Sequence, residues 1–296
     1  MPSASPPQRT PLPPERPGYA APADLLERRT ALAAAVAAGY WHTVPEPQQL
    51  EIGGVRCLRF APPDRAIGTV LHFHGGAFRL GCPEQIGSFA AELAARCHVT
   101  VICPAYRLAP EHPFPAGLAD AQSVMNALIS SGEGRLVISG DSAGGGLAAG
   151  LAAISDQTSL RLAGLALLSP WLDLAVTNPS FVINAASDPL FSAESARIAA
   201  EFYLQGLSAE HPIASPLHGQ TAGYPPTFIN VGTGEVLLDD ARLLHARLSA
   251  AGVAVQFHPV EGMEHVAVTR DRTLPGSAET FDILAGFIDQ ILADSD

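Results

Sequence analysis

The fold is decided by the stretch Val137-Ile138-Ser139-Gly140-Asp141-Ser142-Ala143-Gly144-Gly145-Gly146. A β-branched run reaches the pattern Gly-x-Ser-x-Gly and passes at once into small residues, which predicts a strand that turns directly into a helix. Such a turn forces Ser142 into strained backbone geometry, and the glycines at positions 140 and 144 leave room for the crossing backbones. The serine hydroxyl is therefore expected to stand above the sheet, in the position of a nucleophile.

The start of the helix that follows is expected to stabilise negative charge. Its first N–H groups have no partner within the helix, and they point towards the serine. The amide of Ala143 is therefore expected to bind a substrate oxygen that becomes negative during a reaction. In a chain with 27 glycines, a loop-to-helix turn without catalytic meaning is the alternative.

A second glycine motif lies upstream, where residues 70–78 indicate a buried strand that ends in His-Gly-Gly. Glycines let a backbone approach a substrate closely, and this loop is the usual source of further oxyanion donors in the same architecture. The N–H groups of Gly75, Gly76 and Ala77 are expected to converge with that of Ala143 on one oxygen.

Two histidines flank this motif on one face of the strand. His72 and His74 are alternate residues, so a metal site and simple packing are both open readings of the pair. We favour packing, with the ring of His74 bracing the loop through a hydrogen bond to its backbone.

A serine nucleophile needs a histidine base and an orienting carboxylate, and in this architecture the chain order is serine, acid, histidine. Residues 226–232 predict a strand, and Glu235 falls in the turn just past its end. Residues 253–260 predict a further strand, and His265 falls in the loop after it. Glu235 is therefore the predicted acid and His265 the predicted general base.

Other acidic and imidazole side chains are weaker candidates. Asp239 and Asp240 are expected in the first turn of a helix, where carboxylates oppose the helix dipole. Asp141 neighbours the serine, but its side chain is expected to point elsewhere and to give structural support. Surface or hydrogen-bonded positions are expected for the remaining histidines: His42, His98, His112, His211, His218, His245 and His258.

Several motifs together resemble the bacterial hormone-sensitive-lipase-like group of α/β-hydrolases. The resemblance rests on residues 74–76, 106–116 and 140–145, and it extends through shorter matches over nearly the whole chain after about residue 45. The shorter matches are residues 168–174, 187–189, 214–217 and 262–265. The resemblance implies a carboxylesterase acting on short- to medium-chain esters, with neither a metal nor an organic cofactor.

The chain departs from the family pattern at two positions. Ala77 stands where the oxyanion loop usually has a third glycine, although alanine still donates its N–H. Glu235 stands where the family usually has aspartate, and the longer glutamate side chain can still reach an imidazole. The acid assignment is therefore the one that most needs a structure.

Length and composition favour one catalytic domain with a small cap. The chain has 296 residues, of which 47% are hydrophobic and 16% charged, so it can bury a large core. Alternating helical and strand patterns predict a mostly parallel central sheet flanked by helices. The resemblance implies that this is the α/β-hydrolase fold, with about eight strands and a helical cap. A net charge of −12 without a basic cluster argues against partners such as nucleic acid or an anionic membrane.

The expected organisation has four parts. Residues 1–20 are rich in proline and indicate a flexible arm. Residues 21–48 indicate helical structure, and the resemblance implies that these N-terminal helices and a later insertion form a cap over the active site. The catalytic domain is expected over residues 49–172 and 216–296, and a helical cap insertion with several aromatic residues over 173–215. Such a cap would line the mouth of the pocket, exclude water and limit acyl length.

Location and partners follow from further patterns. Residues 28–39 have the basic-then-apolar pattern of an export signal, but the pattern begins too far from the N-terminus and fits an amphipathic helix better. The four cysteines show neither zinc nor redox spacing, which favours reduced, mostly buried thiols in a cytoplasmic protein. No apolar run of the sequence is long enough to span a bilayer, so no stable membrane association is expected. The expected partner is a small-molecule ester, and a homodimer is left open.

Two other functions compete with an esterase. A hydrolase of lactones or amides would use the same residues, and residues 169–174 also resemble a segment in hydrolases of cyclic terpene lactones. A non-catalytic receptor is more distant, since the plant gibberellin receptors resemble this fold but have lost the catalytic histidine. Here Ser142 and His265 are both present.

Overall fold

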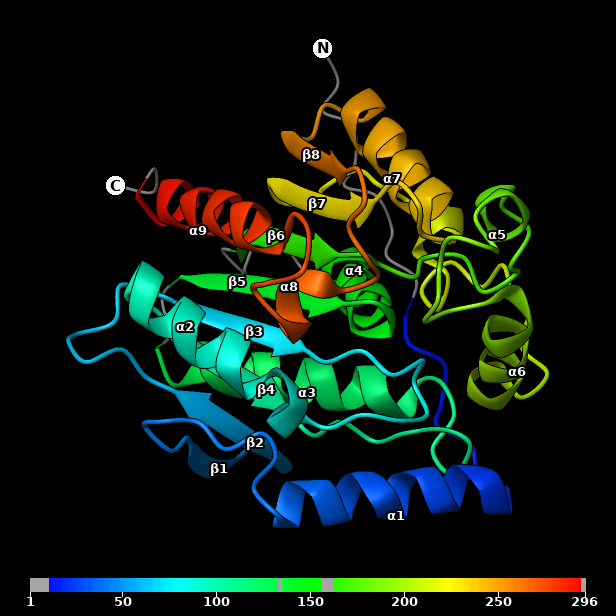
Figure 1. Ribbon diagram of the computed structural model, residues 1–296, viewed down its shortest axis with the longest axis horizontal. Coiled ribbons are helices and arrows are strands. Elements are labelled where there is room, and N and C mark those ends of the chain that lie inside the picture. Colours follow the sequence, from blue (N-terminus) through cyan, green and yellow to red (C-terminus); the bar gives the residue numbers. More distant parts are fainter. Residues whose placement is uncertain (1–10, 133–134, 156–161, 294–296) are drawn as a thin grey trace.

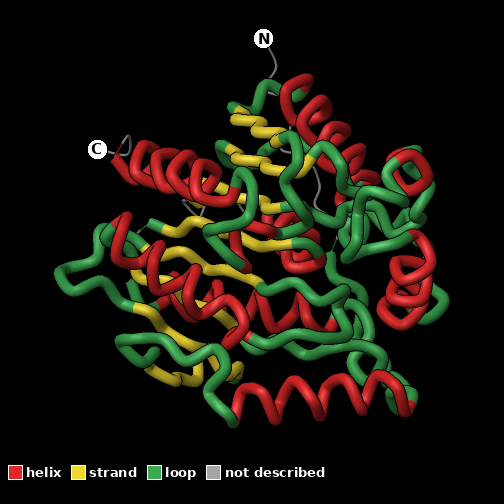
Figure 2. Tube along the Cα trace, viewed as in Figure 1, coloured by secondary structure: helices red, strands yellow, loops and turns green. Residues whose placement is uncertain are grey.

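The computed structural model describes residues 11–132, 135–155 and 162–293. An eight-stranded sheet with the order β1-β2-β4-β3-β5-β6-β7-β8 forms its centre, and helices lie on both sides of it (Figure 1; Figure 2). Strands β1 and β2 are antiparallel to their neighbours and all the others are parallel. The strands are β1 (Gln48–Ile52), β2 (Val55–Phe60), β3 (Thr69–Phe73), β4 (Thr100–Pro104), β5 (Leu136–Asp141), β6 (Leu162–Leu168), β7 (Thr227–Gly232) and β8 (Val255–Val260).

Two apolar clusters hold the helices to the sheet. One joins it to α3, α4 and α7, and the other joins its opposite face to α2, α8 and α9. The central strands read as continuous apolar runs because both of their faces are buried. The helices are α1 (Ala23–Ala37), α2 (Gly87–Cys97), α3 (Ala116–Ser130), α4 (Ala143–Ile154), α5 (Ser180–Ile183), α6 (Ala193–Leu204), α7 (Leu238–Ala250), α8 (Ala267–Arg270) and α9 (Ser277–Ala293), with short 3₁₀ turns at Pro83–Ile86 and Pro216–His218.

The parallel strands bring distant loops to one edge of the sheet. Phe73 at the end of β3 pairs with Gly140 of β5, and Gly232 at the end of β7 pairs with Val260 of β8. The loops that follow these strands therefore begin side by side, although they are far apart in sequence. In open sheets of this kind, ligands bind at the carboxyl ends of the strands.

The described part of the predicted N-terminal arm, residues 11–20, contains no helix or strand but contacts the rest of the molecule. Arg16 donates hydrogen bonds to the carbonyl oxygens of Leu204 (2.7 Å) and Gln205 (3.1 Å) at the end of α6. Glu15 forms an ion pair with Arg107 at 2.7 Å. This segment is anchored more firmly than its composition indicates, and residues 1–10 lie outside the described part.

In the region expected to hold N-terminal cap helices, the described chain has the single helix α1, which lies along one edge of the molecule (Figure 1). Leu25 is its one buried residue, so apolar packing contributes little to its attachment. Arg29 provides polar attachment instead. Its guanidinium forms an ion pair with Glu111 at 2.7 Å and donates to the carbonyl oxygens of Arg79 (2.9 Å) and Ala109 (2.6 Å).

The segment between β6 and β7 carries α5 and α6 and lies to one side of the sheet (Figure 1). Phe181, Phe191 and Tyr203 of this segment join the apolar cluster that also contains α4. The four cysteines are free thiols, and Cys82 alone among them is partly exposed. Within the described ranges, none of the helices combines the length and apolar character needed to cross a membrane.

Candidate active site

The tight turn predicted around Ser142 is present between β5 and α4. Ser142 has φ of 52° and ψ of −121°, a backbone conformation that residues other than glycine rarely adopt. A Cβ atom on Gly140 would lie 2.2 Å from the carbonyl oxygen of Gly144, and one on Gly144 would lie 2.0 Å from that of Phe73. Both glycines are therefore required by backbone crossings, as the sequence predicts.

Backbone hydrogen bonds fix this turn. The N–H of Ser142 donates to the carbonyl oxygen of Leu168 (2.9 Å), and its own carbonyl oxygen accepts from the N–H of Trp171 (2.9 Å). Trp171 is fully buried, so the segment after β6 supports the turn from within the core. The side chain of Ser142 lies on a pocket of about 550 Å³.

Three side chains from distant segments form one chain of hydrogen bonds. Nε2 of His265 lies 3.0 Å from Oγ of Ser142, and Nδ1 of His265 lies 2.7 Å from Oε2 of Glu235. All three are at least nine-tenths buried. Burial disfavours the charged imidazolium, but the hydrogen bond and the negative charge of Glu235 outweigh it, so the pKa of His265 is raised above its usual value.

The second oxygen of Glu235 is also fixed. Oε1 accepts hydrogen bonds from the hydroxyl of Ser169 (2.7 Å) and from the N–H of Gly232 (2.5 Å). The hydroxyl oxygen of Ser169 accepts in turn from the N–H of Val266, next to the histidine (3.2 Å). Ser169 thus links the acid loop to the histidine loop. Its role was missed from the sequence, although it lies within the matched segment 168–174.

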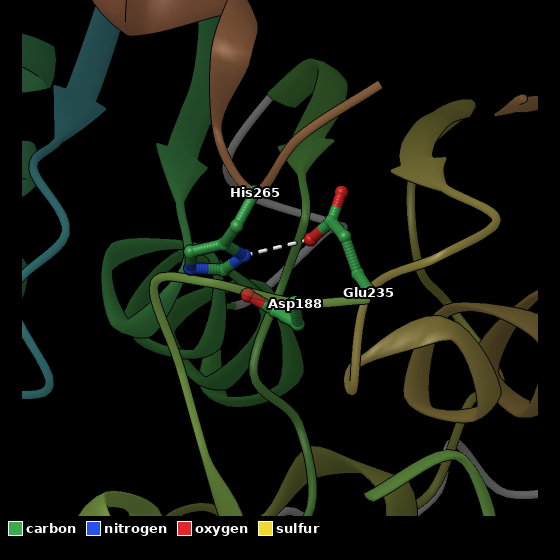
Figure 3. A group of neighbouring side chains, drawn as sticks. All are labelled: Asp188, Glu235 and His265. Atoms are coloured by element: carbon green, nitrogen blue, oxygen red, sulfur yellow. Dashed lines mark hydrogen bonds and ion pairs between the residues drawn. The ribbon is translucent and has the colours of Figure 1, made fainter. Parts of the chain in front are cut away.

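A second carboxylate, from the segment between β6 and β7, lies beside the same imidazole (Figure 3). Asp188 accepts through Oδ2 from the N–H of Val236 (3.0 Å), the residue after Glu235, and through Oδ1 from the N–H of Phe191 (3.1 Å). The ring of Phe191 stacks on that of His265, with centroids 5.8 Å apart. The negative charge of Asp188 adds to the forces that raise the pKa of His265. Sequence reasoning missed this residue too, although residues 187–189 carry part of the resemblance.

Asp188, Glu235 and His265 also have the composition of a metal site, with ligand atoms within 4.8 Å of one another. Their polar atoms are already engaged, however. Both oxygens of each carboxylate accept hydrogen bonds, and the two ring nitrogens contact Glu235 and Ser142. Hydrogen bonding therefore accounts for the whole arrangement of this cluster.

The rival acids lie elsewhere, as expected. Both belong to the first turn of α7. Asp240 is buried and accepts from the N–H groups of Leu172 (2.7 Å) and Asp173 (2.9 Å), and its burial raises its pKa to about 7. Asp239 accepts from the N–H of Ser180 (2.9 Å). These carboxylates hold the segment after β6 to α7, and neither bonds to His265.

Asp141 and His72 support the loop rather than the reaction centre. Nε2 of His72 lies 3.2 Å from Oδ1 of Asp141, and its Nδ1 lies 3.0 Å from Oγ of Ser139. A Cβ atom on Gly75 would approach Oδ2 of Asp141 to 2.5 Å. This buried pair thus packs directly under the His-Gly-Gly loop, which agrees with the structural role predicted for Asp141.

The His-Gly-Gly loop lies directly against the turn at Ser142. A Cβ atom on Gly75 would lie 3.2 Å from Cβ of Ser142, and one on Gly76, which has φ of +120°, would lie 1.9 Å from the carbonyl oxygen of Leu80. Within the described ranges, the N–H groups of Gly76 and Ala77 donate to no acceptor. Ala143 is the first residue of α4, so its N–H is also free of the helix.

His74 has the bracing position predicted for it. Its Nδ1 lies 2.7 Å from the carbonyl oxygen of Gly75, and its ring stacks on that of Tyr106 at 4.4 Å between centroids. The hydroxyl of Tyr106 donates to the carbonyl oxygen of His74 (2.7 Å). Burial lowers the pKa of His74, so the neutral ring is favoured.

Comparison with known proteins agrees with this geometry. A family profile described as the alpha/beta hydrolase fold matches residues 70–269. The acetyl-hydrolase of Streptomyces hygroscopicus is 37% identical over 248 residues, which are 83% of each chain, and an esterase of Acinetobacter venetianus is 36% identical over 218 residues, or 72% of each chain.

Solved structures give the same result. The crystal structure of EstE5 has a TM-score of 0.84 at 31% identity and covers 94% of both chains. That of an esterase from the bacterial hormone-sensitive lipase family has a TM-score of 0.79 at 30% identity, over 92% of this chain and 100% of the other. The chain therefore belongs to the α/β-hydrolase fold family. More particularly, it is a carboxylic ester hydrolase of the bacterial hormone-sensitive-lipase-like group, which confirms the predicted fold and family.

Proposed function

We propose that this protein is a serine carboxylesterase that cleaves short- to medium-chain esters through an acyl-enzyme intermediate. The observation that carries the proposal is the single line of contacts from Ser142 through His265 to Glu235, at 3.0 and 2.7 Å. Nucleophile, base and orienting acid within hydrogen-bond reach are the defining geometry of this chemistry. The free N–H groups beside the serine can bind the negative oxygen of the reaction intermediate, which this chemistry also requires.

In the proposed first step, neutral His265 accepts the Ser142 proton on Nε2 while the serine oxygen attacks the ester carbonyl carbon. Glu235 holds the proton on Nδ1, which presents Nε2 as an acceptor, and it stabilises the imidazolium that forms. His265 then gives its proton to the departing alcohol oxygen. The acyl group remains bound to Ser142.

Backbone amides hold the negative oxygen of each tetrahedral intermediate. We assign this role to the N–H groups of Gly75, Gly76, Ala77 and Ala143. Each well-placed donor contributes about 3 to 4 kcal/mol to transition-state stabilisation in comparable sites. Water then attacks the acyl carbon while His265 accepts its proton. His265 gives that proton to the departing oxygen of Ser142, which releases the acid and restores the serine hydroxyl.

The cap is proposed to limit acyl length. It would comprise residues 21–48 and 173–215, and it contributes Leu190, Phe191 and Tyr40 to the lining of the pocket. A pocket of about 550 Å³ with these apolar side chains in its lining suits butyryl to octanoyl chains better than a long acyl chain. Closing these side chains over the ester would also exclude water from the hydrogen-bonded groups.

The test is a panel of 4-nitrophenyl esters from acetyl to palmitoyl, measured for the wild type and for Ser142→Ala. We expect kcat/KM to be highest between butyryl and octanoyl and to vanish in the variant. A maximum at palmitoyl would refute the chain-length proposal. Full activity in a folded Ser142→Ala protein would refute the serine mechanism.

A further inference from the structure

Three arginines line the pocket that contains Ser142, and this concentration contrasts with the net charge of −12. Arg79 extends from the His-Gly-Gly loop, Arg28 from α1, and Arg270 from α8. Arg270 is already paired, with Glu264 at 3.0 Å, and it also donates to the carbonyl oxygen of His265. The other two arginines are different.

Arg79 is half-buried and has few partners of its own. Its Nη2 donates to the hydroxyl of Ser195 (3.0 Å), and its guanidinium lies over the ring of Phe202 at 5.7 Å. Neither Arg79 nor Arg28 forms an ion pair with any residue that the structure describes. A guanidinium has five N–H donors, so most of those of Arg79 have no acceptor in the described part of the chain.

The neighbouring charges compensate Arg79 only in part. Burial and the positive charge of Arg28 lower the pKa of Arg79, while Asp24 of α1 acts in the opposite sense from beyond ion-pair distance. The carboxylates that line the pocket are engaged elsewhere, Asp141 with His72 and Asp271 with Thr273. An anion between the two guanidinium groups would relieve their mutual repulsion.

The backbone around Arg79 is also fixed. Its N–H donates to the carbonyl oxygen of Gly76 (3.1 Å), and its carbonyl oxygen accepts from Nε of Arg29 (2.9 Å). Arg79 follows Ala77 by two residues, so its backbone belongs to the same loop as the proposed oxyanion donors, and Ser195 and Phe202 contact its guanidinium. A group bound by Arg79 would therefore have a defined position relative to the scissile ester.

We propose that Arg79 and Arg28 form an anion subsite in the pocket, and that the preferred substrates are esters that also carry a carboxylate. This inference rests on the proposed esterase function and names its substrate class. A carboxylate suits a guanidinium because two parallel N–H···O bonds can form, and such charge-assisted bonds are the strong ones. The apolar wall around Phe191 would hold the rest of the ester.

The experiment compares matched ester pairs that differ only by a methyl cap on the carboxylate. One pair carries the charge on the alcohol side, 4-acetoxybenzoate and its methyl ester. The other carries it on the acyl side, mono-4-nitrophenyl adipate and its methyl ester, with release of 4-nitrophenol followed. The readout is the ratio of kcat/KM for the charged and the capped member, in the wild type, Arg79→Gln, Arg79→Lys and Arg28→Gln.

In at least one pair, the wild type is expected to prefer the charged ester about tenfold, the value of one good ion pair of this kind. Arg79→Gln should abolish the preference, Arg79→Lys should keep part of it, and Arg28→Gln should reduce it less. Added salt should weaken it because one partner is exposed to solvent. The matched control is Arg96→Gln, which removes the same charge from the α2–α9 surface, paired there with Asp289, and should keep the preference.

Two negative results would have different consequences for the anion subsite and for the esterase proposal. Hydrolysis of the capped esters without any preference for the charged ones, or a preference that survives Arg79→Gln, would overturn the subsite and leave the esterase proposal intact. Hydrolysis of none of the four esters by the folded wild type would instead count against the esterase proposal, and with it against the subsite.

Discussion

The two sides of the candidate site are held in different ways. On the side of Ser142, backbone sterics dominate, since glycines at positions 140, 144 and 76 allow contacts that no Cβ atom would permit. On the side of Glu235 and His265, the hydroxyl of Ser169 donates to Glu235 and the carboxylate of Asp188 accepts from the N–H of Val236, and these hydrogen bonds hold the loops in place. The backbone geometry around Ser142 can be predicted from a short glycine motif. The hydrogen bonds around Glu235 and His265 depend on residues that are far apart in the sequence and meet only in the fold.

The largest effect is expected where the two sides meet. Ser142→Ala and His265→Ala should each lower kcat by about a million-fold, because the residues of such a triad act as a unit. Thermal unfolding should stay near that of the wild type, since neither change alters the glycine crossings. The double variant should be little worse than either single one. Additive losses would show that the two residues do not act together.

The identity of the acid is the next test. Glu235→Ala should lower kcat by about ten-thousand-fold, because the imidazole loses both its orientation and the charge that stabilises its protonated form. Asp239→Ala, on the neighbouring helix, should lower kcat less than about tenfold, because the carboxylate of Asp239 contacts Ser180 and Arg242 and not His265. The reverse ranking would transfer the acid role to Asp239.

The steric side can be tested without touching a reacting group. Gly144→Ala should lower kcat/KM by about a hundredfold or more, because its Cβ atom must displace the backbone around Ser142. The free energy of unfolding should fall by at least the ~1–3 kcal/mol usual for overpacking. Gly286→Ala in α9 is the control, as its Cβ atom would meet nothing within 4 Å, and it should be neutral or slightly stabilising. Equal behaviour of the two variants would contradict the steric account.

The hydrogen-bonded side should respond to Ser169. Ser169→Ala removes a hydroxyl that donates to the Glu235 carboxylate, and hydrogen bonds to charged groups contribute about 1.5–3 kcal/mol, so kcat should fall by roughly 10- to 100-fold. Ser187→Ala, which removes an exposed hydroxyl bonded to the carbonyl oxygen of Gly234, is the matched control. We expect it to retain activity, and a loss as large as that of Ser169→Ala would count against a specific role for Ser169.

The smallest effect should follow from Asp188→Asn, with a distinctive pH dependence. A general base must be neutral, so activity rises as the pH increases through the pKa of His265, which lies above 6.5. Without the charge of Asp188 this pKa should fall, so the acid limb of the kcat/KM profile should move to lower pH, with a loss of about tenfold at the plateau. Asp239→Asn should leave the limb in place, and an unchanged limb in Asp188→Asn would remove Asp188 from the positioning of the imidazole.

The same division explains what the sequence could predict. The fold and the strands ending at Phe73, Asp141 and Gly232 follow from apolar runs, glycine patterns and motif order, and the fold is confirmed. Motifs and loop position predict Ser142, Glu235 and His265 as the site residues, and the structure brings them together, while their catalytic roles stay predictions. Their supporting residues Ser169 and Asp188 lie in segments that carry the resemblance, but the segments alone do not show a role, because a serine or aspartate in a loop gains its role from a long-range partner.

The central claim is that the imidazole of His265 activates the hydroxyl of Ser142. The most direct measurement is labelling by a fluorophosphonate, with the modified peptide located by mass spectrometry and the rate compared between wild type and His265→Ala. The account predicts one label per chain, on Ser142, and a rate at least a hundredfold slower in the variant. A label on another residue, or equal rates in the two proteins, would contradict it.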